Sequence, residues 1–168
     1  MSELSDEPDS PADLDHRSLA VELAEARAAL IEALRALPES RAYRASERVG
    51  WTLKHELSAL GAADAELTHV IEELRRRSDT VTLELRRRRA ETMHGLQSMR
   101  LTPLIERLEQ DGARAIEALA EHGHELARAV HIERPKPDSS PAPATGLAHA
   151  YRERVRHALA AIHAALGR

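Results

Sequence analysis

The stretch from Gly50 to Leu74 constrains the fold more than any other part of this chain. Leucine or isoleucine recurs along it at positions 53, 57, 60, 67, 71 and 74. This spacing places the apolar side chains on one face of a helix, and Asp64 interrupts that face. A helix with one apolar face must bury it against other elements, so the stretch predicts one wall of a helical bundle.

The composition agrees with a bundle. The chain has 168 residues of which 42% are hydrophobic, enough for the core of one domain, which we place at residues 11–168. Only 2% of the residues are aromatic and none is Phe, so the core must consist of aliphatic side chains, which favours closely packed helices over a sheet. Without cysteine the chain cannot form disulfides, thiolate metal ligands or a cysteine nucleophile.

The same periodicity predicts an all-α four-helix bundle with an additional short helical segment between helices 2 and 3. Four main helices are expected over about residues 11–37, 50–75, 103–123 and 147–166, with a shorter or irregular helix at 80–97. Ser10 and Pro11 have the residue types of an N-cap and a first helical position. Thr52 lies too late to be a clear cap for the second helix.

Two segments lack an apolar pattern. Residues 1–10 are acidic and are predicted to form a disordered tail. Residues 133–146 contain four prolines and no large apolar residue, which predicts an exposed linker within the domain. The start of the chain has no basic, then apolar, leader pattern and no segment has the length of a membrane span, so we expect a cytoplasmic protein.

Three features together resemble the DinB/YfiT-like superfamily. They are the long leucine-patterned first helix, the sequence Gly50-Trp51-Thr52-Leu53-Lys54 at the entry to the second, and the last helix ending in Ile162-His163-Ala164-Ala165-Leu166. The resemblance covers about residues 14–167. The superfamily includes metal-dependent hydrolases, thiol-dependent transferases and the mycothiol-dependent maleylpyruvate isomerase domain, so the resemblance implies a bundle with a divalent metal in its cleft.

The resemblance also implies where the metal ligands would lie. Family members place one histidine on the second helix, eight residues after the tryptophan, and an HxxxH pair on the last helix. These positions fall on Ala59, Arg154 and Ala158. Alanine has no donor atom and arginine is always cationic, so no metal site is favoured in this alignment.

A shift of one residue would match the pair to Glu153 and His157, and His55 lies one helical turn before Ala59. These three side chains form the alternative metal set, which could take nickel, zinc or iron. At about 100° per residue, Glu153 and His157 lie opposite the apolar face of the last helix, which argues against that set.

The cleft that the resemblance implies has five candidate residues. They are Trp51, His55, Glu56, Asp64 and Arg154. A carboxyl group at Glu56 or Asp64 would have a raised pKa suited to acid–base chemistry if it is buried without a partner. The favoured interpretation is an ion pair with an arginine from a neighbouring helix, and His55 is read as a surface histidine.

Two charged groups outside the cleft give weaker signals. His122, His124 and His131 are the densest group of histidines, but residues two apart point in different directions on a helix. Residues 75–100 hold eight arginines against three acidic residues, and the runs at 75–77 and 86–89 could bind phosphates. Because aromatic stacking residues and nucleic-acid motifs are missing, a solvated, partly salt-bridged surface is favoured.

These observations predict a DinB-like protein whose metal site has degenerated and which binds a small molecule or a protein partner in the cleft; its catalytic residues, if any, are not identified. The first alternative is a thiol-dependent transferase or isomerase, or a metal-dependent hydrolase, with the rearranged metal site. The second is nucleic-acid binding through residues 75–89. A homodimer formed through a leftover apolar face is also possible.

Overall fold

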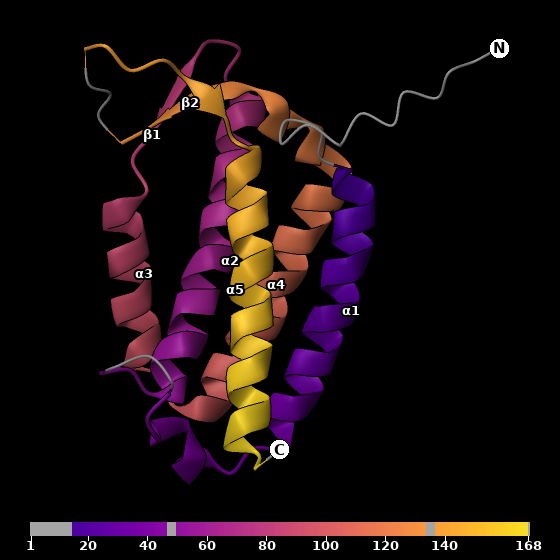
Figure 1. Cartoon of the computed structure of the whole chain (residues 1–168), viewed down its shortest axis with the longest axis vertical. Coiled ribbons are helices and arrows are strands. Elements are labelled where there is room, and N and C mark those ends of the chain that lie inside the picture. Colours follow the sequence, from indigo (N-terminus) through magenta and orange to yellow (C-terminus); the bar gives the residue numbers. More distant parts are fainter. Residues whose placement is uncertain (1–14, 47–49, 134–136, 168) are drawn as a thin grey trace, which may run out of the picture.

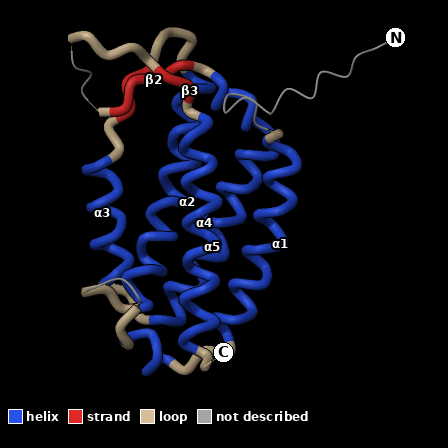
Figure 2. The backbone as a smooth tube through the Cα atoms, in the orientation of Figure 1, coloured by secondary structure: helices blue, strands red, loops and turns tan. Residues whose placement is uncertain are grey.

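The computed structural model describes residues 15–46, 50–133 and 137–167 (Figure 1). These residues form five α-helices, two short 3-10 helices and three short strands. Figure 2 shows that helices make up most of the backbone. In chain order the elements are α1 (His16–Arg35), η1 (Glu39–Tyr43), α2 (Leu53–Arg76), β1 (Val81–Leu83), α3 (Arg86–Gln97), α4 (Leu101–His122), η2 (Gly123–Ala127), β2 (Ala129–Ile132), β3 (Ala142–Pro143) and α5 (Thr145–Ala165).

Helices α1, α2, α4 and α5 form the bundle. Helix α4 packs against α1 and α2, and α5 packs against the same two helices from the other side, so each helix has two neighbours. Helix α3 lies outside this group and packs on α2, as Figure 1 shows. The predicted four-helix bundle with an additional helical segment between the second and third helices is therefore confirmed.

The apolar face of α1 is buried in the core of the bundle. In α1, Leu19, Leu23, Leu30 and Leu34 are buried, as their spacing predicts. The described part of this helix begins at His16, where the side chain of Asp15 accepts a hydrogen bond from the backbone N–H of Ser18. The predicted acidic tail and the predicted cap at Ser10 and Pro11 lie outside the described residues.

Thr52 caps α2, so the prediction that this residue lies too late to be a clear cap was wrong. Its Oγ1 accepts a 3.3 Å hydrogen bond from the backbone N–H of His55, while its own N–H donates to His55 Nδ1 at 3.0 Å. The helix begins at Leu53 rather than at Gly50, which has a positive φ of 78°. Thr52 is therefore in the cap position, and the apolar face that follows is buried as predicted.

A small sheet at one end of the bundle was not predicted. Strand β2 pairs in parallel with β1, matching Val81 with Val130, and antiparallel with β3. Residues 81–83 were predicted as part of an irregular helix, but Val81 and Leu83 alternate with exposed Thr82 and lie in a strand. The predicted linker at 133–146 also departs from an exposed coil, because Ala142–Pro143 form β3 and Ala144 is buried.

The sheet and α2 together position α3. Oε1 of Glu133 accepts hydrogen bonds from the backbone N–H groups of Leu85 and Arg86, at 3.0 and 2.7 Å, at the start of this helix. Leu96, the buried residue of α3, lies over Gly61 of α2, where a Cβ atom would come within 2.5 Å of Leu96 Cδ1. Helix α3 is therefore held at both ends while most of its surface faces solvent.

Candidate functional site

A cavity of about 360 Å³ lies between α2, α3 and α5. Ligand pockets in proteins usually measure about 300–1,000 Å³, so this cavity has the size for a small molecule. Its walls combine aromatic and aliphatic side chains with three charged ones. The residues that line it are Trp51, Ala59, Ala63, Glu66, Leu67, Arg89, Met93, Leu147, Ala150, Tyr151 and Arg154.

Two ion pairs join the elements around this cavity. Nη2 of Arg89 on α3 lies 2.6 Å from Oε1 of Glu66 on α2. Nη1 of Arg154 on α5 lies 3.8 Å from Oε2 of Glu56 on α2, which is longer than a hydrogen bond. The side chain of Glu56 is 7% exposed and that of Arg154 is 29% exposed, so the arginine is the more accessible partner.

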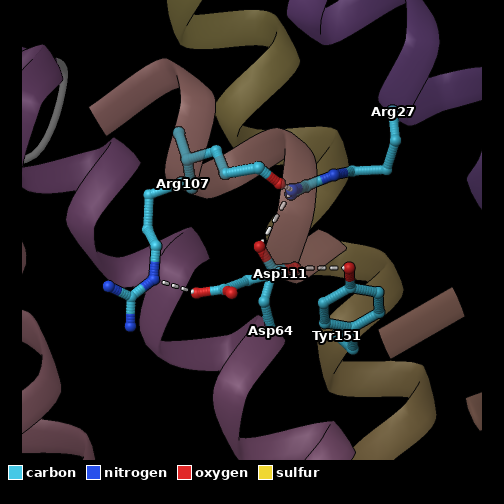
Figure 3. Close-up of polar contacts among 6 residues, drawn as sticks. Arg27, Asp64, Arg107, Asp111 and Tyr151 are labelled. Carbon is cyan, nitrogen blue, oxygen red and sulfur yellow. Dashed lines mark hydrogen bonds and ion pairs between the residues drawn. The ribbon is translucent and has the colours of Figure 1, made fainter. Parts of the chain in front are cut away.

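A buried polar network lies beside the cavity and connects three helices (Figure 3). Asp64 of α2 is fully buried, and its Oδ2 accepts a 2.8 Å hydrogen bond from Nη2 of Arg27 on α1. Its Oδ1 accepts a 2.5 Å hydrogen bond from the hydroxyl of Tyr151 on α5. Tyr151 also lines the cavity, so the network reaches the wall of the candidate site.

Burial dominates the electrostatics of this network. It raises the pKa of Asp64 from the ordinary 3.8 to about 6, although the Arg27 charge and the hydrogen bonds from Tyr151 and Arg27 oppose the shift. Burial also raises the pKa of Tyr151 well above the ordinary 10, and the neighbouring Asp64 charge adds to that increase. The favoured interpretation of Asp64, an ion pair with an arginine of a neighbouring helix, agrees with this geometry.

Gly112 of α4 makes room for the network. A Cβ atom at this position would lie 2.1 Å from Nη2 of Arg27 and 2.6 Å from its Cζ. Nη2 also donates to the backbone carbonyl of Leu108, one helical turn before Gly112. The guanidinium group therefore occupies the space that a side chain at Gly112 would take.

Comparisons with known proteins show which solved structures have a similar arrangement of helices. The sequence matches no protein-family model and no curated protein sequence significantly. The crystal structure of a mycothiol-dependent maleylpyruvate isomerase superposes with a TM-score of 0.69 and 14% sequence identity, over 91% of this chain and 62% of the isomerase chain. A histidine-to-alanine mutant of the mycothiol-dependent maleylpyruvate isomerase gives the same TM-score and coverage with 15% identity.

This chain has the DinB/YfiT-like fold. At this level of identity the likeness concerns the fold alone. The chain spans less than two thirds of the isomerase chain that it matches. No helix in the described residues is both long and apolar enough to cross a membrane.

The DinB-like resemblance implies metal ligands at three positions, and two of them line the cavity. Ala59 of α2 and Arg154 of α5 both line the cavity. Ala158, one turn further along α5 than Arg154, is buried in the core. Two of the three positions therefore lie in the wall of the cavity, where this chain has an alanine and an arginine.

The alternative metal set is not brought together. Glu153 and His157 are exposed on α5, away from the buried face that contains Val155 and Ala158. His55 uses its Nδ1 in the cap of α2 and does not line the cavity. Among the described residues, no three histidine, aspartate or glutamate side chains are arranged so that they could hold a metal ion.

The arginine-rich segment and the histidine group lie outside the cavity, apart from Arg89. Several arginines in residues 75–89 are paired with acidic neighbours, such as Arg77 with Glu73 and Arg87 with Glu91. The rings of His122 and His124 lie 6.4 Å apart, whereas His131 is in β2. Nucleic-acid binding through the arginine-rich residues 75–89 stays a prediction.

Sequence reasoning identified part of the candidate site. It proposed Trp51 and Arg154, which line the cavity, and Asp64, which lies behind its wall. It did not identify Arg27 and Tyr151 as partners of Asp64. The spacing of Leu23, Arg27 and Leu30 places Arg27 in the buried stripe of α1, and this signal could have identified it.

Proposed function

We propose that this protein binds a small organic anion in the cavity between α2, α3 and α5. The observation that carries the proposal is the position of Arg154, a permanent cation in the wall of the cavity at a place where the fold resemblance implies a metal ligand. A cation at that position can neutralise an anionic group of a ligand, because its ion pair with Glu56 is long, at 3.8 Å, and the arginine is the more accessible partner. In this proposal the cavity is a binding site in which arginine has replaced the metal.

The remaining walls support a ligand with a flat apolar body. Trp51 and Tyr151 supply aromatic surface, and Met93 and Leu147 supply adaptable aliphatic surface. A contact between an arginine and a carboxylate is charge-assisted and therefore stronger than a hydrogen bond between neutral groups. A small aromatic carboxylate therefore matches both the apolar walls and the charge of Arg154.

Trp51 provides a direct test because it is the single tryptophan of the chain and lines the cavity. Titration with benzoate is expected to change its fluorescence in a saturable way, whereas the uncharged isostere benzamide changes it at least about tenfold more weakly. Replacement of Arg154 by glutamine should abolish the preference for benzoate. The matched control is Arg156→Gln, two residues further on the same helix, where the arginine is exposed and pairs with Glu22.

The outcomes separate binding from general charge effects. A benzoate response that persists in Arg154→Gln, or that falls equally in Arg156→Gln, would remove Arg154 from the proposal. Absence of any saturable response to benzoate and other small aromatic acids, in protein shown to be folded by circular dichroism, would reject the site as an anion pocket.

A further inference from the structure

A second cavity lies on the other side of the bundle, along the groove between α1 and α4. It measures about 620 Å³ and shares no lining residue with the cavity between α2, α3 and α5. Its walls are mainly small or aliphatic side chains from the two helices. They include Ala24, Ala28 and Ile31 of α1 and Ala113, Ile116 and Ala120 of α4. Because alanine side chains are short, the two helix backbones form the sides of an apolar channel of ligand size.

Arg27 gives this groove a polar floor. It lines the groove, yet the residue is only 5% exposed. Its Nη2 is used by Asp64 and by the carbonyl of Leu108. Its Nη1 is buried and donates to no group in the part of the chain that the structure describes. A buried N–H donor without an acceptor is unfavourable, so this atom would gain from an oxygen acceptor supplied by a ligand or by a bridging water.

The charges around the groove select against an anion. The rim carries Glu32, Glu109 and Glu117 against the single cation Arg35. The charge of Arg27 is already balanced by Asp64 in the buried ion pair. A carboxylate in the groove would lose hydration and meet a net negative rim, whereas an uncharged carbonyl, ester or hydroxyl oxygen would not.

We infer that the groove between α1 and α4 is a second small-molecule site, for an uncharged amphiphile. The apolar part of the ligand lies along the alanine-lined channel. Its oxygen faces the floor and accepts a hydrogen bond from Nη1 of Arg27, directly or through one water. This site shares no lining residue with the proposed anion pocket and takes an uncharged ligand in place of an anion.

Backbone NMR of the full chain tests this inference with two probes of equal chain length, 2-octanone and octanoate. Addition of 2-octanone is expected to shift the amide signals of Ala24, Ala28 and Ala113 in a saturable way. Octanoate is expected to bind there at least about tenfold more weakly, because its charge must be desolvated beside the acidic rim. The variant Glu117→Gln removes one negative charge from the rim, so it should reduce the difference in affinity between 2-octanone and octanoate.

A groove-filling variant makes the test independent of Arg27, whose replacement could unfold the bundle. Ala28 is exposed and lines the groove, so Ala28→Phe should fill the channel and weaken 2-octanone binding by about tenfold or more. The matched control is Ala29→Phe, which adds the same side chain to an exposed position of α1 that does not line the groove.

Four results would overturn the inference. They are the lack of saturable shifts with 2-octanone, tighter binding of octanoate than of 2-octanone, equal loss of binding in Ala28→Phe and Ala29→Phe, and shifts confined to residues around Trp51. Concentration-dependent shifts of the same amides without any probe would instead assign the groove to a second copy of this chain, and would also overturn it.

Discussion

The hydroxyl of Tyr151 donates a 2.5 Å hydrogen bond to Oδ1 of Asp64, and this contact links α5 to α2 inside the core. The other carboxylate oxygen of Asp64 accepts from Arg27, which links α2 to α1. One buried carboxyl group therefore connects three of the four bundle helices. Because polar groups in a core are costly when they lose a partner, the stability of the bundle depends on keeping all three residues together.

Removal of the Tyr151 hydroxyl should destabilise the protein. In Tyr151→Phe the ring still packs, but Oδ1 of Asp64 loses its hydrogen bond in a buried place, and we expect a loss of about 1–3 kcal/mol. Urea denaturation followed by circular dichroism measures this change. The control is Tyr43→Phe, at a residue that is 54% exposed, where the change should stay within about 0.5 kcal/mol. Equal effects of the two variants would contradict the prediction.

The stability contribution of Asp64 should decrease as pH rises. Its pKa in the folded protein is about 6, above the ordinary 3.8, so the folded state holds a proton that the unfolded state has already released. The contribution is therefore complete below about pH 4 and is lost as pH rises through 6. Carbon-detected NMR of the Asp64 carboxyl group should show a titration midpoint near 6, and a midpoint near 3.8 would refute the shift.

Gly112 should tolerate no side chain. In Gly112→Ala the new Cβ would lie 2.1 Å from Nη2 of Arg27, so the guanidinium or α4 must shift, and we expect this shift to break the ion pair with Asp64. Breaking a buried ion pair typically costs about 3–5 kcal/mol, and thermal unfolding should show a loss of that order. The matched change Gly95→Ala, in exposed α3 with no atom within 4 Å of the new Cβ, should be neutral or stabilising by up to about 1 kcal/mol.

Glu133 should hold the start of α3. In Glu133→Ala the N–H groups of Leu85 and Arg86 lose their acceptor, so their amide hydrogens should exchange faster than in the unmodified protein. Glu133→Gln keeps an acceptor oxygen and should show a smaller increase, and Glu84→Ala, at an exposed neighbour, should show none. Unchanged exchange at Leu85 and Arg86 in Glu133→Ala would contradict this role.

The same contact predicts a pH effect of opposite sign to that of Asp64. The backbone hydrogen bonds from Arg86 and Leu85 lower the pKa of Glu133 below its ordinary 4.5. Protection of these two amides should therefore persist above the ordinary pKa and be lost as pH falls through the lowered value. If the exchange rates of these two amides, corrected for intrinsic exchange, do not change as pH falls through the pKa of Glu133, its charge is not needed to protect them.

Sequence reasoning identified the helices because their signals are local. The three- or four-residue spacing of leucines is sufficient to place the bundle helices to within a few residues, apart from the predicted start of the first helix, which lies outside the described residues. The strand at Val81–Leu83 was missed because three residues carry little periodic signal and their partner strand begins at Ala129, 48 residues later. Pairing of strands so far apart in the sequence depends on how α3 and α4, which lie between them in the chain, pack in the folded protein.

The sequence by itself determined that this chain forms a bundle of aliphatic helices, and it showed that Asp64 lies in an apolar face. The tertiary structure decided which side chains meet Asp64, that Ala59 and Arg154 share a cavity, and that Gly112 leaves space for Arg27. The physical reason is that periodicity fixes which face of a helix is buried, whereas contacts between helices depend on their relative rotation and axial shift. Those two quantities are set by the packing of the whole core.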